Sequence, residues 1–466
     1  MCLVIVVSNI THTLRWRKVM LLQIAIITVI QTSNQYIIIP NYNLIKRDMG
    51  VSDLVLGSMT GLYIFLSGIS TVIWSYIADA YGLRRKPLLL LSILAMGLLT
   101  YIVYLSENII IFFLTRVVTG LFLGAVFPIA FSMIADFFES ERRAKAYMFW
   151  YIISGVGMAL GFGLSAVLGA LFDWRYPIRI NALLLILLGT PLSLSIIEPS
   201  RGMVDIMTLS GGIVEYTHRF SLSDVRMILS NKSNIYVAFE EFVSTLPQGV
   251  LMAWITQYVV RELEATEVIA IIFLGLGMLG GFFGSIIAHL ADKLYTRSFR
   301  YRPLIAAVCS FMQVFFFAVF LLIPLRIGIT EKDIVTSVKA FITMLRSNIL
   351  LQLAILFFFL GMMFNSSIEP IKNSVISDVN LPEQRAIVAS SISTIELFFR
   401  SAGIAVAGLI IDLTGNIRFT LLFFVLLYLF AGNLWLRVVK HYPSDIEVTR
   451  ERLKVRVGNT QSSNNP

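Results

Sequence analysis

Long apolar runs divide most of this sequence of 466 residues. A helix needs about 20 mainly apolar residues to cross the hydrocarbon core of a bilayer. An unbroken helix also satisfies its own backbone hydrogen bonds in lipid, so such runs predict transmembrane α-helices. The expected spans are residues 18–40, 54–78, 87–105, 109–134, 144–171, 177–197, 234–260, 267–290, 303–325, 348–376, 386–411 and 417–438. The sequence therefore predicts an all-α membrane protein with about twelve transmembrane helices.

The composition excludes most other classes of protein. The chain is 57% hydrophobic and 14% charged, whereas a soluble domain has about 45–50% apolar and about 25% charged residues. Two cysteines and four scattered histidines provide neither a disulfide framework nor a metal site. The sequence also lacks the G-x-x-x-x-G-K-[ST] loop that binds nucleotide phosphates. We expect no cofactor, no metal, no nucleic-acid partner and no enzymatic activity.

The positive charges predict how the chain lies in the membrane. An even number of spans places both termini on one side. The loops and tails of that side carry 24 Lys and Arg residues, against 10 on the opposite side. Because cytoplasmic loops are enriched in cations, both termini are expected in the cytoplasm. The favoured location is the plasma membrane of a prokaryote.

Two pairs of repeated segments indicate a duplicated unit. The polar hinge Ser75–Pro87 joins the second and third expected spans, and a weaker copy beginning at Ala288 joins the eighth and ninth. After the fourth and tenth spans, Asp136, Glu141 and Arg143 recur as Asp378, Glu383 and Arg385 at a common offset of 242 residues. Repeats in the same topological sense predict two six-helix bundles related by an axis along the membrane normal.

These repeats set the expected domains. A cytoplasmic tail at 1–17 precedes an N-terminal bundle at 18–197, and a C-terminal bundle at 234–440 precedes a polar tail at 441–466. The linker at 198–233 is cytoplasmic, and within it Ser221–Leu229 has the pattern of a short amphipathic helix at the membrane surface. The apolar spacing in residues 327–347 predicts a surface helix on the opposite side.

The chain resembles the major facilitator superfamily. The family's G/S-x-x-x-D-x-x-G-x-R-R/K loop is matched by Ser75, Asp79, Gly82, Arg84 and Arg85. Its fourth-span pattern R-x-x-x-G-x-x-x-G is matched by Arg116, Gly120 and Gly124. The resemblance covers about residues 15–440. It implies a secondary active transporter that moves a small organic solute by alternating access, with the solute bound near the midplane between the halves.

Two further segments look like Spinster-type carriers within that superfamily. They are Leu44–Asp53 after the first span and Glu198–Gly202 after the sixth. Such carriers often have Asn-Tyr-x-Asp-Arg in the first span, where the Asp is linked to proton coupling, but here Asn34 takes that position. An amide does not exchange protons in the physiological range. Either another carboxyl group couples transport, or the carrier is not driven by protons.

Polar residues inside the spans are the candidate site residues, because an ionisable side chain in a membrane is costly. Arg116 lies at a depth similar to that of Asn34 and Gln35. If the family's packing holds, Arg116 faces these amides and can bind a carboxylate or phosphate through two hydrogen bonds. The alternative is an arginine that only ties two helices together.

Two local charge pairs are expected in the second half. Glu396 and Arg400 are four residues apart, and Glu369 and Lys372 are three apart around Pro370, so each pair shares a helical face. Each pair is a candidate for substrate binding or coupling, with simple helix packing as the alternative.

Glu240 and Glu241 are adjacent in the seventh span, so their side chains point about 100° apart and face different partners. Together with Glu369 and Glu396, they are the candidates to replace the absent first-span Asp in coupling. The glycine run Gly155, Gly157, Gly161, Gly163 and Gly169 of the fifth span somewhat resembles the family's antiporter motif, and close helix packing explains it equally well.

The resemblance also implies a cytoplasmic gate that holds the halves together in the outward-open state. Its candidate residues are Asp79, Gly82, Arg84, Arg85, Asp136, Arg143, Asp292 and Arg385. The alternative is that these charges only orient the spans.

Two other functions remain open from the sequence. One is a lipophile or multidrug exporter on the same fold, and the other is a membrane sensor that binds a ligand without transporting it. The mixed charges inside the spans fit an amphipathic or zwitterionic solute or an organic anion, and the Spinster-type segments suggest a lysolipid-like amphiphile. The expected partners are this solute, the lipid bilayer and a coupling ion such as the proton, with the protein acting as a monomer.

Overall fold

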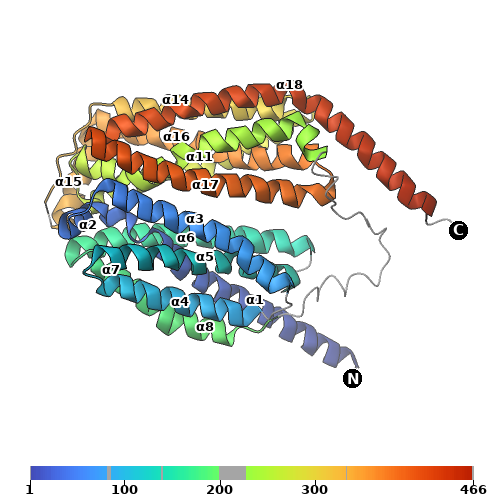
Figure 1. The fold of residues 1–466 in the computed structure, drawn as a ribbon, viewed down its shortest axis with the longest axis horizontal. Coiled ribbons are helices and arrows are strands. Elements are labelled where there is room, and N and C mark those ends of the chain that lie inside the picture. Colours follow the sequence, from blue (N-terminus) through green and yellow to red (C-terminus); the bar gives the residue numbers. More distant parts are fainter. Residues whose placement is uncertain (1, 81–84, 138–139, 199–226, 332, 464–466) are drawn as a thin grey trace. The chain divides into compact units, whose positions relative to one another are not determined.

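The computed structural model describes residues 2–80, 85–137, 140–198, 227–331 and 333–463, and these ranges contain helices and no β-strand. The chain divides into two compact units, unit 1 at Met1–Ile213 and unit 2 at Val214–Pro466 (Figure 1).

Unit 1 is a bundle of long helices joined by short connections. Its helices are α1 (Cys2–Tyr36), α2 (Tyr42–Met49), α3 (Asp53–Ala80), α4 (Arg85–Leu105), α5 (Ile109–Phe137), α6 (Ser140–Leu171), α7 (Arg175–Leu184) and α8 (Thr190–Ser195). The 3₁₀ turn Ile39–Asn41 precedes α2, and the π-helical turn Leu185–Gly189 makes α7 and α8 one continuous span. Residues 2–17, expected to be a tail, belong to α1.

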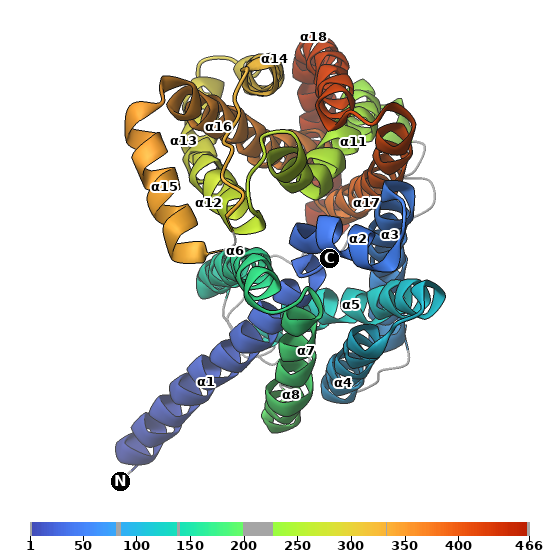
Figure 2. The ribbon, with the colours of Figure 1, turned by 90° about the vertical axis from the view of Figure 1, so that its left-hand side faces the viewer.

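Unit 2 repeats this arrangement and adds a surface helix. Its helices are α11 (Lys232–Arg261), α12 (Glu267–Met278), α13 (Gly280–Tyr295), α14 (Tyr301–Leu322), α15 (Ile334–Ser347), α16 (Ile349–Val379), α17 (Pro382–Thr414) and α18 (Ile417–Ser463). The helix predicted between 327 and 347 is α15, which packs against α12 and α16 (Figure 2).

The described residues contain eleven helical stretches long and apolar enough to cross a membrane. The helix α11 is not among these eleven, although it has 30 residues. Its sequence includes Glu240, Glu241, Gln248 and Gln257, which lower its hydropathy. With α11 included, the helices are consistent with the twelve spans expected from the sequence, and the all-α membrane fold is confirmed.

Helix ends in unit 2 follow ordinary capping chemistry. The side chains of Asn231, Thr266, Asp333 and Asn348 accept hydrogen bonds from backbone N–H groups in the first turns of α11, α12, α15 and α16. The hydrogen bonds that Thr336 donates lower the pKa of Asp333 below its usual value.

Glycines permit close contact between helices in unit 1. In α5, Gly120 lies against the backbone of Tyr63 in α3, and Gly124 lies against the backbone of Ser67, which also belongs to α3. In α6, a Cβ atom at Gly161 would lie 2.6 Å from the carbonyl oxygen of Ser33 in α1. Because no side chain separates them, these helix pairs approach at backbone distance.

The helix α18 continues well beyond the last expected span. Residues 441–463, predicted to be a polar tail, are helical. Tyr442 and Ile446 are buried, and the Thr449 hydroxyl donates to the carbonyl oxygen of Val379 at 2.9 Å. These three residues share one helical face, and that face docks on unit 2.

Most of the predicted linker at 198–233 lies outside the described residues, because the structure does not describe 199–226. The last part of the predicted amphipathic helix, residues 227–229, is helical.

Candidate functional site

The buried arginine of unit 1 binds the C-terminal end of α1. Arg116 is 4% exposed. Its Nη1 donates to Asn34 Oδ1 at 3.1 Å, and its Nη2 donates to the backbone oxygens of Asn34 at 3.0 Å and Gln35 at 2.9 Å. The guanidinium carbon lies 4.1 Å from the centre of the Tyr63 ring. The last carbonyl groups of a helix lack intrahelical partners and carry partial negative charge, so a cation satisfies them well.

Asn34 is the centre of a neutral hydrogen-bond network. Its Nδ2 donates to Thr100 Oγ1 at 2.9 Å and to Asn181 Oδ1 at 2.8 Å, and Asn181 donates onward to the backbone oxygen of Ile30 at 3.2 Å. A carboxylate at position 34 would have no N–H group for the Asn181 oxygen. The Asn34 amide is therefore suited to this network.

The second polar cluster lies in unit 2 and joins α11 to α16. Lys372 Nζ lies 2.5 Å from Glu241 Oε2 and 2.5 Å from Glu369 Oε2. Lys372 is 5% exposed and Glu241 is 2% exposed, whereas the Glu369 side chain is 59% exposed. The structure thus brings together the predicted pair in α16 and adds Glu241, which lies 131 residues earlier in the chain.

Glu240 differs from its neighbour. It is 1% exposed, and within the described residues its Oε2 atom has no hydrogen-bond partner. Ser244 and the buried Trp435 of α18 lie beside the carboxyl group, and Lys372 is close enough for its charge to act on Glu240. In the same described part of the chain, Trp435 Nε1 also makes no hydrogen bond. Glu240 is therefore a buried carboxyl group that lacks an ion-pair partner of its own.

The predicted pair in α17 also exists in the structure. Arg400 forms an ion pair with Glu396, and its Nη2 donates to Gln248 Oε1 of α11 at 2.9 Å. A Cβ atom at Gly249 would lie 2.6 Å from the Arg400 carbonyl oxygen, so α11 and α17 are in close contact here. The charge of Glu396 is near enough to act on Glu241.

One candidate gate residue, Arg85, contacts the end of the last span of unit 1. Its backbone N–H donates to Glu198 Oε1 at 2.5 Å, its Nε lies 3.6 Å from the same oxygen, and the N–H of Lys86 donates to Glu198 Oε2 at 3.3 Å. A carboxylate is favourable at the N-terminus of α4, where backbone N–H groups lack partners.

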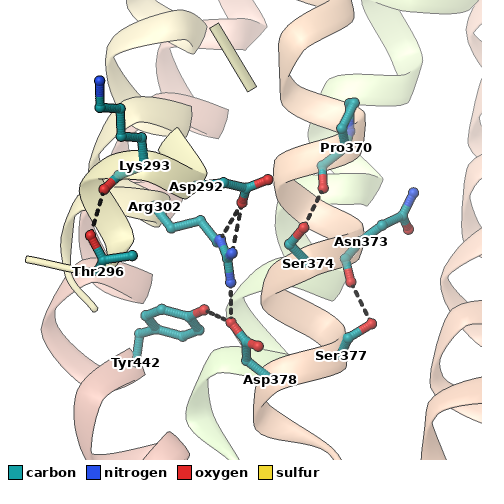
Figure 3. A network of polar contacts seen from close by, with 10 residues as sticks. All are labelled: Asp292, Lys293, Thr296, Arg302, Pro370, Asn373, Ser374, Ser377, Asp378 and Tyr442. Atoms are coloured by element: carbon teal, nitrogen blue, oxygen red, sulfur yellow. Dashed lines mark hydrogen bonds and ion pairs between the residues drawn. The ribbon is translucent and has the colours of Figure 1, made fainter. Parts of the chain in front are cut away.

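Unit 2 has a larger network at the corresponding helix ends, shown in Figure 3. Arg302 of α14 donates to Asp292 of α13 from Nη2 at 2.6 Å and from Nε at 3.1 Å. It also binds Asp378 of α16, which accepts a second hydrogen bond from the Tyr442 hydroxyl of α18. The guanidinium carbon of Arg302 lies 3.9 Å from the centre of the Tyr295 ring. Four helices of unit 2 therefore meet at one arginine.

Sequence reasoning placed Asp292 in the gate but missed Arg302 as its partner, and it missed Tyr442 as a partner of Asp378. The available signals were the cations that follow Asp292 and the repeat that relates Asp378 to Asp136. Spacing alone did not show that these residues converge.

The other candidate gate residues cannot be placed by their contacts. Gly82 and Arg84 lie outside the described residues, and Asp79, Asp136, Arg143 and Arg385 lie in helices whose side chains at these positions are not described. Their role stays a prediction. The described residues contain no group of three or more His, Cys, Asp or Glu side chains placed to hold a metal ion.

Comparison with known proteins gives a family and several relatives. The family model described as Major Facilitator Superfamily matches residues 24–330. The puromycin resistance protein pur8 of Streptomyces alboniger is 30% identical over 177 residues, which are 37% of this chain and 34% of that protein. The sphingosine-1-phosphate transporter SPNS2 of Danio rerio is 23% identical over 220 residues, which are 47% of this chain and 42% of that protein.

The matched part is less than half the length of these curated relatives. Among solved structures, a bacterial homologue of the human lysosomal transporter Spinster, in an inward-facing and unoccupied conformation, aligns with a TM-score of 0.74. The alignment covers 92% of this chain and 98% of that one at 15% sequence identity, which indicates a shared fold.

Proposed function

The chain belongs to the major facilitator superfamily, and we propose that it is a secondary active transporter that moves a small organic solute across the membrane by alternating access. The proposal is supported by the family, by a described set of long helices consistent with twelve spans, and by relatives named as transporters. Each unit also contains a buried polar cluster, which a purely structural helix bundle in lipid does not need.

The observation that carries the proposal is the cluster of Glu240, Glu241 and Lys372. Removing these charged groups from water costs several kcal/mol per ion, and only one pair among them is compensated by an ion-pair contact. Natural membrane proteins retain such groups where they bind a substrate or an ion. We assign substrate binding and coupling in unit 2 to Glu240, Glu241, Glu369, Lys372, Glu396 and Arg400.

The charge balance of these six residues favours a solute with a positively charged amine. Four carboxyl groups face two cations, so the set has an excess of negative charge when fully ionised. In unit 1, Arg116, Asn34 and Gln35 form the candidate contact for an anionic group of the solute. Both Nη atoms of Arg116 already donate hydrogen bonds, so an anion has to replace one of these contacts to bind.

An amphipathic solute is favoured by the relatives. Their names include resistance to puromycin and transport of sphingosine-1-phosphate, and both compounds combine an amine with an apolar part. Export of a lipophile or drug is therefore the second candidate function on this fold. We propose a small or lipid-like organic solute as the main partner, beside the lipid bilayer and a coupling ion.

We further propose that the termini face the cytoplasm, that the protein lies in the plasma membrane of a prokaryote, and that it acts as a monomer without enzymatic activity. The bias of cations toward one set of loops supports the orientation. The contacts of Arg85 with Glu198, and of Arg302 with Asp292 and Asp378, lie at helix ends on that side and are assigned to the cytoplasmic gate.

Purified protein in proteoliposomes tests the transport function. The solutes are puromycin, sphingosine-1-phosphate and a nucleoside, each with and without a pH gradient. We expect uptake of at least one solute above protein-free vesicles, and a decrease of about tenfold or more in Lys372→Gln, since tenfold corresponds to only about 1.4 kcal/mol. The matched control is Lys339→Gln on the exposed side of α15, which we expect to transport normally.

Binding without flux points to the sensor instead. If a solute raises the unfolding temperature but never enters the vesicles, the transport proposal is wrong. Equal flux in wild type and Lys372→Gln would show that the unit 2 cluster is not needed for substrate binding or coupling.

A further inference from the structure

Two of the three carboxyl groups near Lys372 share its ammonium group. Lys372 is in contact with Glu241 and Glu369, each at 2.5 Å. Glu240 has no such contact, although it is buried as deeply as Glu241. Among these carboxyl groups, Glu240 is the one that can change its charge without breaking an ion pair.

The charged and polar groups near Glu240 come from three helices. They are Glu241 and Ser244 of α11, Lys372 and Glu369 of α16, and Tyr428 and Trp435 of α18. Glu396 and Arg400 of α17 act on the next residues out, Glu241 and Tyr428. Arg400 is engaged by Glu396 and Gln248, and the Tyr428 hydroxyl contacts the Asn365 amide at 3.3 Å. Lys372 is therefore the nearest cation for Glu240, and two other carboxylates already bind it.

Both protonation states of Glu240 can exist at this place. A buried carboxylate without a partner costs several kcal/mol, and a bound proton removes that charge. The ionised form is still within reach of a donor, because the indole N–H of Trp435 lies beside the carboxyl group and is not bonded to another described residue. A carboxyl group balanced between two such states can take up a proton from one side of the membrane and release it to the other.

We propose that Glu240 is the proton-binding group that couples transport to the proton gradient, and that the Glu241–Lys372 ion pair beside it keeps its charges throughout. This inference rests on the proposed transport function and names its coupling ion. The proton binds as an O–H group on Glu240 and leaves from the same oxygen, and the pair beside it stays ionised.

Infrared spectroscopy of the purified protein tests proton binding without any solute. A protonated carboxylic acid has a carbonyl stretching band that a carboxylate lacks. Difference spectra between about pH 6 and about pH 9, where exposed carboxylates stay ionised, therefore report the buried groups that titrate. We expect a band in wild type that is missing in Glu240→Gln and present in Glu369→Gln. The Glu369→Gln control removes an exposed carboxylate from the same lysine, so it separates proton binding from a general disturbance of the cluster.

The inference is overturned if Glu240→Gln keeps the full band, or if wild type shows no titrating carboxyl band over the accessible pH range. A band that is lost in Glu241→Gln but kept in Glu240→Gln would show that the proton binds Glu241 and not Glu240. These results do not depend on solute transport, so they stand even if no solute of the panel is carried.

A transport measurement adds a second readout once a carried solute is found. In Glu240→Gln, uptake driven by a pH gradient should fall at least about tenfold, whereas exchange of labelled for unlabelled solute should continue, because exchange needs no net proton movement. Gradient-driven uptake that stays at the wild-type rate contradicts the inference. Loss of both activities to the same degree also contradicts it, since that result indicates a structural role only.

Discussion

Arg116 combines a buried charge with contacts that lie 82 residues earlier in the chain. The sequence placed it near Asn34 and Gln35, and the structure brings these residues together. The partners were not predictable, because two of the three acceptors are backbone oxygens at the end of α1. A side-chain pattern carries no information on where a helix exposes its last carbonyl groups. In this structure Arg116 ties two helices together, and anion binding by Arg116 stays a proposal.

Replacement of Arg116 should therefore destabilise unit 1. Hydrogen bonds to charged groups contribute about 1.5–3 kcal/mol each, and a buried acceptor left without a donor adds a penalty. We expect Arg116→Leu to cost at least about 2 kcal/mol, and Arg116→Lys to cost less because its ammonium keeps the charge but not the planar fork. Thermal unfolding of the detergent-purified protein measures the effect. Arg346→Leu on α15 is the control, because Arg346 is exposed.

An unchanged unfolding temperature in Arg116→Leu, combined with lost solute binding, would show that the guanidinium is held for the ligand rather than for the helix end.

The local charge pairs were predictable and the long-range pairs were not. Glu369 with Lys372 and Glu396 with Arg400 follow from helical spacing alone, and both pairs exist in the structure. The contact of Glu241 with Lys372 depends on how α11 and α16 pack. The spacing of residues along one helix does not determine how a neighbouring helix is rotated about its own axis. The sequence therefore identified these residues as candidates but did not show which of them pair.

At the scale of the helices, the glycine run of α6 has two different surroundings. A Cβ atom would lie 2.8 Å from the Val29 carbonyl oxygen at Gly157 and 2.6 Å from the Ser33 carbonyl oxygen at Gly161, whereas at Gly155 and Gly163 it would meet no atom within 4 Å. Close packing against α1 explains the first two positions. The sequence could not distinguish the packed glycines from the unpacked ones, because a glycine looks the same in the sequence whether or not another helix lies against it.

This difference predicts opposite effects for two alanine substitutions in one helix. Gly161→Ala should destabilise the protein by about 1–3 kcal/mol, because the added methyl group forces α1 and α6 apart. Gly163→Ala should be neutral or stabilise by up to about 1 kcal/mol, because alanine favours the helix and meets no neighbour. Thermal unfolding of both variants under the same conditions decides. Equal destabilisation by both would mean that α6 does not pack on α1 through Gly161.

The extension of α18 shows how tertiary contacts override composition. Residues 441–463 are polar enough to suggest a tail, yet Tyr442 binds Asp378, and the Asp445 carboxylate accepts hydrogen bonds from the backbone N–H and the hydroxyl of Ser233 at 2.8 Å and 2.6 Å. The apolar positions Tyr442 and Ile446 are spaced for one helical face, but a face of two residues is too weak a signal in the sequence to predict docking.

At the scale of the whole molecule, hydropathy was sufficient to predict the transmembrane helices. Spans of about 20 apolar residues leave helices as the structure that satisfies the backbone in lipid, and the half-repeats then indicated two bundles. Side-chain chemistry entered the prediction only where the spans carry charge. In the long span α11 the two signals conflict, because the polar residues that lower its hydropathy include the candidate coupling residues Glu240 and Glu241.

The proposed orientation in the membrane is based on the charges in the loops, and it can be tested by cysteine labelling. In a Cys2→Ser background the remaining native cysteine, Cys309, is buried. We expect a membrane-impermeant maleimide added to intact cells to label Glu107→Cys, in the connection between α4 and α5, and not Thr296→Cys, in the connection between α13 and α14. Both positions are exposed, so a difference in labelling reports the side of the membrane and not burial.

After the cells are permeabilised, Thr296→Cys should react as well. The reverse pattern would place the cationic loops outside, and labelling of both positions in intact cells would mean that the units are not inserted in the same sense. In either case the two repeats could not form a duplicated carrier with a cytoplasmic gate.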